Sequence, residues 1–239
     1  GSGKSSLVRA LAVDLLKKGE KVGYLALEES NKRSALGLMS NARGKAYHIG
    51  EHGQEELTDA FNDTIANWNL YLFDGFGSFD PDVIYNRIEY LASGLECRII
   101  FLDHLSILLS GLDGDERRMI DTTMTRLRSL VERTGITLFL VSHLRRSSSD
   151  SNSHEEGGRV SLGQLRGSHS ISQISDSVIA MERDQQSEDA NNITTLRVLK
   201  NRYSGSTGVA TRLTYDLSSC QFYETKNDEQ PEFDPTEDF

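Results

Sequence analysis

The sequence predicts an α/β fold: a mostly parallel, twisted sheet with helices on both faces and an antiparallel extension toward the C-terminus. In the first 140 or so residues, short apolar runs alternate with helical patterns, as in parallel strands joined by crossover helices. Later apolar runs follow one another with little helix between them, which favours antiparallel pairing. Several of the early runs end directly on a polar residue.

Helices are predicted where apolar residues recur at three- and four-residue spacing. The helical ranges, in chain order, are 4–18, 32–41, 54–67, 80–94, 115–134 and 170–175. Lys18-Gly19 is a typical C-terminal signal, and Asp80-Pro81 provides a cap followed by a first-turn proline. These signals set the expected ends of the first and fourth helices.

Strands are predicted where short apolar runs lie between turn residues. The strand ranges are 22–27, 70–73, 98–103, 136–141, 178–181, 194–199 and 209–215. Residues 145–163 are rich in serine, glycine and charge without periodicity, which predicts a loop.

The chain begins with Gly1-Ser2-Gly3-Lys4-Ser5-Ser6, the second half of the pattern G-x-x-x-x-G-K-[ST]. In such a phosphate-binding loop, backbone N–H groups surround the phosphates, Lys4 neutralises them and the Ser5 hydroxyl ligates Mg²⁺. The alternative is a Gly/Ser linker, but the motif continues directly into an apolar helical pattern. We therefore expect a nucleoside triphosphate ligand, and a chain that starts inside the loop without the preceding strand and first glycine.

Composition predicts one domain over residues 1–223 and an acidic, disordered tail over 224–239. The net charge is −10, of which the tail contributes −6, so net charge alone does not decide whether the body binds nucleic acid. Cys97 and Cys220 lack metal-ligand spacing, which favours a reduced compartment without zinc. No run of about 18 apolar residues predicts a membrane span.

Three polar residues are expected at the carboxyl edge of the sheet, where ligands bind in such folds. Asp103 is a candidate for organising Mg²⁺ beside Ser5, against the alternative of a turn cap. Glu28 is a candidate general base, although spacing alone does not separate it from Glu29. His143 is a candidate sensor of the terminal phosphate or, alternatively, a core histidine.

Two basic segments allow more than one interpretation. Arg145, Arg146 and Arg166 lie among serines and glycines, which suits phosphate contacts, but composition favours a plain surface loop. Lys200 and Arg202 end a strand, where they would either stay solvated or reach a neighbouring subunit's γ-phosphate.

Seven separated segments together resemble the helicase domain of the bifunctional primase-helicases of short-tailed bacteriophages, in the DnaB-like hexameric replicative helicase family. The segments are Leu27-Glu28-Glu29-Ser30, Phe101-Leu102-Asp103-His104-Leu105-Ser106, Asp115-Glu116-Arg117-Arg118-Met119-Ile120-Asp121, His154-Glu155-Glu156-Gly157, Leu165-Arg166-Gly167-Ser168, Glu182-Arg183 and Leu199-Lys200-Asn201-Arg202-Tyr203-Ser204-Gly205.

The resemblance implies a RecA-like motor in a ring of six, or alternatively seven, subunits around single-stranded DNA. NTP hydrolysis, with ATP or dTTP and Mg²⁺, would drive 5′-to-3′ translocation and unwinding at the replication fork, in the cytoplasm of an infected bacterium. It assigns Lys4, Ser5, Glu28, Asp103 and His143 to the roles given above.

The resemblance also extends to other positions. Arg202 matches a trans-acting arginine finger with Lys200 beside it, Arg183 an arginine near the nucleotide, and Tyr215 an aromatic packed on the base. Arg145, Arg166 and Gly167 match DNA-contacting loop positions.

The acidic end at Phe239 resembles the segment by which the phage enzymes dock the replicative DNA polymerase and compete for single-strand-binding protein, against the alternative of a solubilising tail. The zinc-binding and primase portions of those enzymes have no counterpart in the sequence, so the resemblance does not extend to priming. Two rival functions stay open: a RecA- or KaiC-like NTPase that assembles without unwinding, and a fragment that only docks polymerase.

Overall fold

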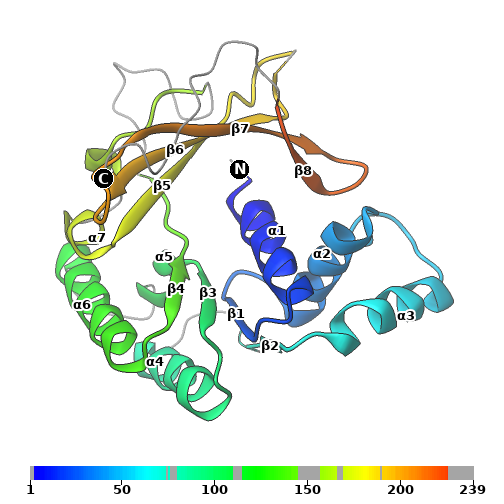
Figure 1. The fold of residues 1–239 in the computed structure, drawn as a ribbon, viewed down its shortest axis with the longest axis horizontal. Coiled ribbons are helices and arrows are strands. Elements are labelled where there is room, and N and C mark those ends of the chain that lie inside the picture. The colour runs from blue at the N-terminus through cyan, green and yellow to red at the C-terminus, as the bar shows by residue number, and fades with distance from the viewer. Residues whose placement is uncertain are drawn as a thin grey trace. The chain divides into compact units, whose positions relative to one another are not determined.

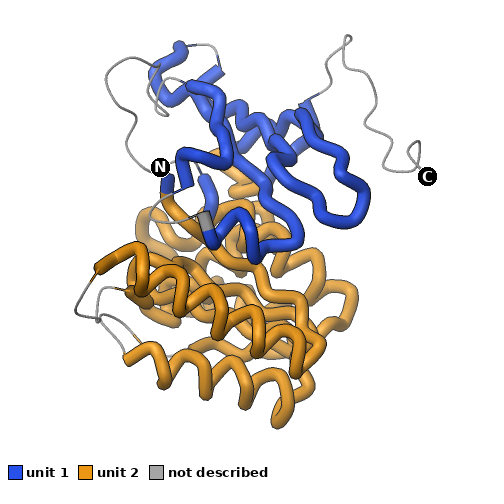
Figure 2. The backbone as a smooth tube through the Cα atoms, turned by 90° about the vertical axis from the view of Figure 1, so that its left-hand side faces the viewer, with its two compact units in different colours: residues 1–4, 144–216, 222–239 blue, residues 5–143, 217–221 orange. Residues whose placement is uncertain are grey.

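The computed structural model describes residues 3–73, 75, 80–109, 115–144, 157–165, 169–188 and 190–225. Their backbone forms two compact units (Figure 2). Unit 2 comprises residues 5–143 and 217–221, and unit 1 comprises residues 1–4, 144–216 and 222–239. No helix in the described part of the chain is long and apolar enough to cross a membrane.

Unit 2 is built on a four-stranded parallel sheet, as the alternation of strands and helices predicts (Figure 1). Its strand order is β2 (Leu70–Leu72), β1 (Val22–Ala26), β3 (Ile99–Asp103) and β4 (Thr137–Leu140). The register pairs Ala26 with Asp103, so β1 and β3 end side by side. That register brings the polar residues after these strands to one edge of the sheet.

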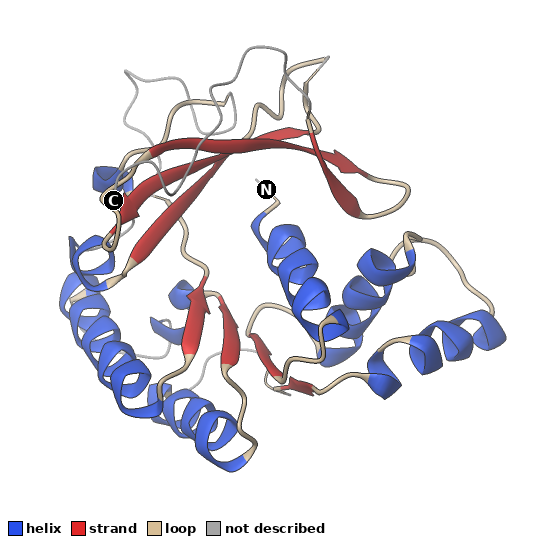
Figure 3. Cartoon of the chain, viewed as in Figure 1, coloured by secondary structure: helices blue, strands red, loops and turns tan. Residues whose placement is uncertain are grey.

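Helices cover both faces of this sheet, as the sequence predicts (Figure 3). On one face, helix α1 (Lys4–Lys17) packs its buried residues against alternate residues of β1, including Val22 and Tyr24. On the other face, a Cβ at Gly23 would lie 2.9 Å from Cδ1 of Leu91. Leu91 belongs to the π-helical turn η2 (Tyr90–Gly94), which continues α4 (Pro81–Glu89), so a larger residue at position 23 would force this side chain to move.

The remaining helices of unit 2 largely confirm the predicted ranges. They are α2 (Asn31–Arg43), α3 (Gln54–Asp63) and α6 (Glu116–Thr134). The prediction of one helix over 54–67 was wrong in detail, because Thr64 leaves helical geometry and a 3₁₀ turn, η1 (Ile65–Asn67), follows. The short helix α5 (Leu105–Leu109), directly after β3, was not predicted.

Unit 1 contains a second sheet, in the order β5 (Ser177–Glu182), β6 (Ile193–Asn201), β7 (Gly208–Asp216) and β8 (Gln221–Glu224). The β5–β6 and β6–β7 pairs are antiparallel, as predicted, but the strands form a sheet of their own instead of extending the parallel one. A 3₁₀ turn, η3 (Leu162–Gln164), and helix α7 (His169–Ile174) precede them.

The second sheet contains a buried ion pair. Glu182 accepts hydrogen bonds from Arg197 Nε and Nη2 at 2.8 and 2.9 Å, and from the Val160 backbone N–H at 2.8 Å. Burial would raise the pKa of Glu182, but the Arg197 and Val160 bonds outweigh it, so the pKa of this carboxyl lies below its usual value.

Candidate nucleotide site

Ser5 and Asp103 form the centre of the candidate site. Ser5 lies in the first turn of α1, and its Oγ donates a 2.7 Å hydrogen bond to Oδ2 of Asp103, the last residue of β3. Asp103 is 6 % exposed, and burial raises its pKa. The Ser5 bond and His104 act in the opposite direction, while the nearby Glu28 raises the pKa further. A buried carboxyl and a hydroxyl beside a second acid offer the hard oxygen ligands that Mg²⁺ prefers.

Glu28 and Glu29 follow β1 but have different surroundings. The Leu27 N–H donates a 2.7 Å bond to the Asp103 carbonyl, which extends the β1–β3 pairing and brings Glu28 next to Asp103. The Glu28 side chain is 51 % exposed. Glu29 is 15 % exposed, and its two oxygens accept from Arg9 Nη2 at 2.6 Å and Ser34 Oγ at 2.8 Å. Glu29 therefore ties α1 to α2, whereas Glu28 faces the pocket.

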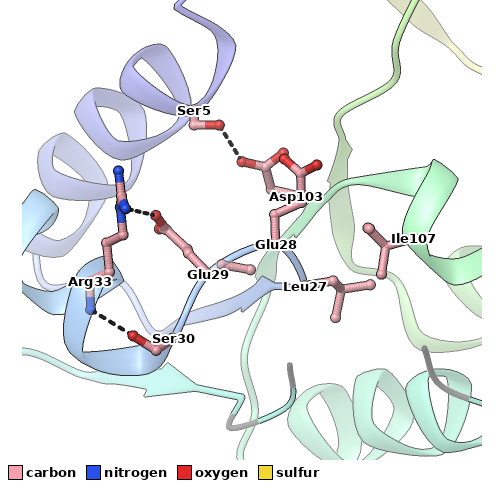
Figure 4. A pocket seen from close by; sticks show the side chains of 9 residues that line it. Ser5, Leu27, Glu28, Glu29, Ser30, Arg33, Asp103 and Ile107 are labelled. Atoms are coloured by element: carbon pink, nitrogen blue, oxygen red, sulfur yellow. Dashed lines mark hydrogen bonds and ion pairs between the residues drawn. The ribbon is translucent and has the colours of Figure 1, made fainter. Parts of the chain in front are cut away.

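The pocket at this edge has a volume of about 760 Å³. Figure 4 shows Ser5 joined to Asp103 within it, with Glu28 beside Asp103 and Glu29 directed toward Arg33. The lining residues all belong to unit 2: Ser5, Ala26, Leu27, Glu28, Glu29, Ser30, Arg33, Asp103 and Ile107. The volume suits a ligand of nucleotide size.

Two histidines lie beside this group. His143 follows β4, and its ring packs edge-on against His104 with centroids 4.1 Å apart. His104 is 3 % exposed, and its Nε2 lies 2.5 Å from Oε1 of Glu28. Glu28, His104 and His143 thus have the spacing of a metal cluster. However, His104 Nδ1 accepts a 3.2 Å bond from the Ser106 N–H, so the proton of the neutral ring is on Nε2, which is then not a metal ligand.

Unit 1 brings Lys200 and Arg202 together at the C-terminal end of α7. Lys200 Nζ donates to the carbonyls of Ser172, Gln173 and Ser175 at 2.7 to 3.1 Å. Arg202 Nη2 donates to the Gln173 carbonyl at 2.8 Å, and its Nη1 lies 2.9 Å from Asp176 Oδ1. Cations at a helix C-terminus are favoured by the unpaired carbonyls there. The Arg202 side chain nevertheless stays 42 % exposed.

The other two predicted nucleotide contacts also lie in unit 1. Arg183 directly follows β5, and its Nε donates to the Asn191 carbonyl across the β5–β6 connection. Tyr215 lies in β7, with its ring centroid 4.9 Å from that of Phe222.

The remaining predicted residues lie at the start of the chain or outside the described residues. Gly3 has a positive φ of 86°, Lys4 begins α1 and Ser6 lies in its first turn. Seven further predicted residues lie outside the described residues: Gly1, Ser2, Arg145, Arg146, Arg166, Gly167 and Phe239.

Sequence reasoning assigned no role to His104, Arg9 or Ser34. A signal for His104 was present, because it comes directly after Asp103 at the end of an apolar strand. The role of Arg9 had no such signal, since it lies within α1 and meets Glu29 only after the helix has packed, whereas Ser34 lies in α2 five residues after Glu29.

Comparison with known proteins identifies the class. Residues 1–224 match the family described as DnaB-like helicase C terminal domain, and the chain belongs to that family. The chain is 35 % identical over 226 residues to the DNA helicase/primase of Enterobacteria phage T3, covering 90 % of this chain and 39 % of that protein. It is 26 % identical to a probable plasmid replicative DNA helicase of Chlamydia muridarum (strain MoPn / Nigg), over 92 % of this chain and 48 % of that protein. The chain therefore spans less than half of each relative.

Solved structures agree on the fold. A DnaB-like replicative helicase, described together with its interactions with primase, superposes with a TM-score of 0.76 at 20 % identity, over 93 % of this chain and 56 % of that one. A second solved structure, described as an ATPase domain, superposes with a TM-score of 0.75 at 20 % identity, over 95 % of this chain and 82 % of that one. The fold is that of the RecA-like ATPase domains of DnaB-like helicases, as predicted.

Proposed function

We propose that this chain is the NTP-hydrolysing motor of a replicative DNA helicase. The observation that carries the proposal is the joining of Ser5, Asp103 and Glu28 in one pocket, in a chain of the DnaB-like helicase family. Asp103 ends β3, Glu28 follows the paired parallel strand β1, and Ser5 lies in the first turn of the helix that the phosphate-binding motif leads into. This arrangement is what phosphoryl transfer to water requires of a protein.

The ligand would be ATP or dTTP with Mg²⁺. Lys4 would neutralise the outer phosphates, with backbone N–H groups of residues 1–6 around them. Ser5 and, through water, Asp103 would hold Mg²⁺, which when bound neutralises charge on the terminal phosphates. The Ser5–Asp103 bond supports this role, because it holds both oxygens together at the edge of the pocket.

Glu28 would act as the general base that orients and polarises the attacking water. Its exposure to the pocket and its place beside Asp103 support it over Glu29, both of whose oxygens are occupied. His143, which borders the same group, would respond to loss of the terminal phosphate. Arg183 and Tyr215 would contact the nucleotide, the latter through its base.

A ring of six or seven copies would complete each site. Arg202 would act in trans on the nucleotide of the neighbouring subunit, with Lys200 beside it. The anchoring of both cations on α7 supports this role, since it fixes their side chains while Arg202 remains partly exposed. Arg145, Arg146, Arg166 and Gly167 would contact single-stranded DNA inside the ring.

The relatives support work at a replication fork. The phage T3 relative carries both helicase and primase in its name, and one structural neighbour is described with its primase interactions. For this chain we propose 5′-to-3′ translocation at a phage fork in the bacterial cytoplasm. Phe239 and the acidic tail would dock the replicative polymerase in competition with single-strand-binding protein.

The test is strand separation of a forked duplex by the protein expressed from its complete reading frame. We expect unwinding that needs NTP, Mg²⁺ and a free 5′ arm and is lost in Lys4→Ala. It should persist in Lys18→Ala, which changes an exposed lysine directly after α1. Hydrolysis without unwinding by assembled rings would instead support a RecA- or KaiC-like NTPase. Deletion of residues 237–239 tests the docking role, because it should abolish polymerase binding and leave NTP hydrolysis intact.

A further inference from the structure

We propose that His104 is a positioning residue, whose buried Nε2–H holds the Glu28 carboxylate in the orientation needed to align the attacking water. The inference rests on the proposed function and deepens it, because it concerns how the general base is oriented. The observation that carries it is the 2.5 Å approach of His104 Nε2 to Glu28 Oε1 beside the Ser5–Asp103 pair.

The backbone brings the two residues together. Leu27 donates its N–H to the carbonyl of Asp103 at 2.7 Å, the last bond of the β1–β3 pairing. Since the register pairs Ala26 with Asp103, Glu28 lies two residues past the end of β1 and His104 one residue past the end of β3. Their side chains therefore leave neighbouring strand ends, within reach of each other.

Hydrogen bonding fixes which ring nitrogen faces Glu28. His104 Nδ1 accepts a 3.2 Å bond from the Ser106 N–H in the first turn after β3. A nitrogen that accepts carries no proton, so the neutral ring presents its N–H from Nε2. The backbone thus selects the tautomer that donates toward the carboxylate.

The ring is held rigidly, whereas Glu28 is not. His104 is 3 % exposed, packs edge-on against His143, and its carbonyl accepts from the Ile107 N–H at 3.2 Å. Its Nε2 has no aligned hydrogen-bond partner among the described residues, and Glu28 Oε1 is the acceptor beside it. A buried donor without a partner favours the Glu28 rotamer that turns an oxygen toward it. A half-exposed glutamate would otherwise sample several rotamers.

Glu28 and Glu29 differ in how many of their carboxylate oxygens have a partner. Arg9 and Ser34 occupy both oxygens of Glu29, whereas His104 meets one oxygen of Glu28. The second Glu28 oxygen is then available for a water in the pocket. His104 would thus act through Glu28, without itself touching the reacting atoms.

Two substitutions separate donation to Glu28 from packing. A glutamine amide reaches the place of Nε2 and keeps the donor toward Glu28, whereas an asparagine oxygen takes the place of Nδ1 and keeps only the Ser106 bond. We expect His104→Gln to retain kcat for NTP hydrolysis within about threefold, and His104→Asn to lower it by about tenfold or more. KM and the melting temperature should change little in both.

A double-mutant cycle shows whether the effect passes through Glu28. In a Glu28→Gln background, His104→Asn should cause no further loss of kcat. Equal activity of the two His104 variants, a larger loss in His104→Gln, or a full additional loss in the Glu28→Gln background would overturn the proposal. Failure of the proposed function would look different, because the wild-type protein would then show no Lys4-dependent hydrolysis at all.

Discussion

Ser5 and Asp103 are 98 positions apart in the sequence, and the hydrogen bond from Ser5 Oγ to Asp103 Oδ2 joins the first turn of α1 to the end of β3. This 2.7 Å bond forms only when α1 and β3 are correctly packed, so the geometry of the candidate site depends directly on the parallel sheet. The same packing removes the carboxyl from water, which raises its pKa and makes its charge costly until a cation arrives.

Asp103→Asn should therefore separate stability from activity. The asparagine oxygen can still accept from Ser5, and a costly buried charge is removed, so we expect a melting temperature equal to or above that of the wild type without ligand. Mg²⁺-dependent hydrolysis should fall by about two orders of magnitude or more. Calorimetry and a phosphate-release assay measure the two effects, and a melting temperature lower by about 5 °C would contradict the first.

Glu28→Gln and Glu29→Gln form a matched pair one residue apart. Glu28→Gln should lower kcat by about 10²- to 10⁴-fold while nucleotide binding and folding persist, because a general base is lost. Glu29→Gln should instead destabilise the protein by about 2 kcal/mol, since Arg9 loses its charged partner. Equilibrium nucleotide binding, kcat and urea unfolding distinguish them. A reversed pattern would make Glu29 the base.

The buried pair of Glu182 and Arg197 should make unit 1 sensitive to acid. The folded-state pKa of Glu182 lies below its usual value of 4.5, so near that pH the unfolded chain binds more protons. The stabilisation is present above about pH 4.5 and is lost as the pH falls through the folded-state pKa. We expect Glu182→Gln to cost about 3 kcal/mol at pH 7 and progressively less in acid.

Denaturant unfolding at several pH values, followed by far-UV circular dichroism, measures this difference. Glu188→Gln, a neighbouring exposed glutamate, is the control and should change nothing. The fluorescence of Trp68, the single tryptophan, reports separately on unit 2. A stability difference between Glu182→Gln and wild type that does not depend on pH would refute the charge argument.

Mixed rings test whether Arg202 acts on a neighbouring subunit. Arg202→Ala should lose hydrolysis by about 10³-fold or more but keep nucleotide binding, because the finger contributes in the transition state. Rings that mix Arg202→Ala with Lys4→Ala subunits should recover part of the activity, since some interfaces then hold an intact site and an intact arginine. Arg212→Ala, an exposed arginine in β7, is the matched control. The absence of recovery at every mixing ratio would exclude a role in trans.

Local patterns in the sequence predicted much of the fold. Hydrophobic periodicity indicated the strands β1 and β3 and the long helix α6, and Asp80 and Asp115 marked helix starts that the structure confirms with side-chain caps. These local patterns did not predict the break at Thr64 or the helix α5. Thr64 departs from helical geometry at φ −128° and ψ −91° without a local signal in the sequence, and α5 is only about one turn long, too short for a periodic signal.

The placement of Glu28, Asp103 and His143 at strand ends could be worked out from the chain alone, because each ends or follows an apolar run and parallel strands end at a common edge. The groups that meet at that edge became visible only in the folded molecule. Arg9 binds Glu29, His104 approaches Glu28, and α7 holds Lys200 and Arg202. The difference is one of range, since periodicity depends on neighbours a few residues apart, whereas the partner of a polar group depends on how distant helices and strands pack.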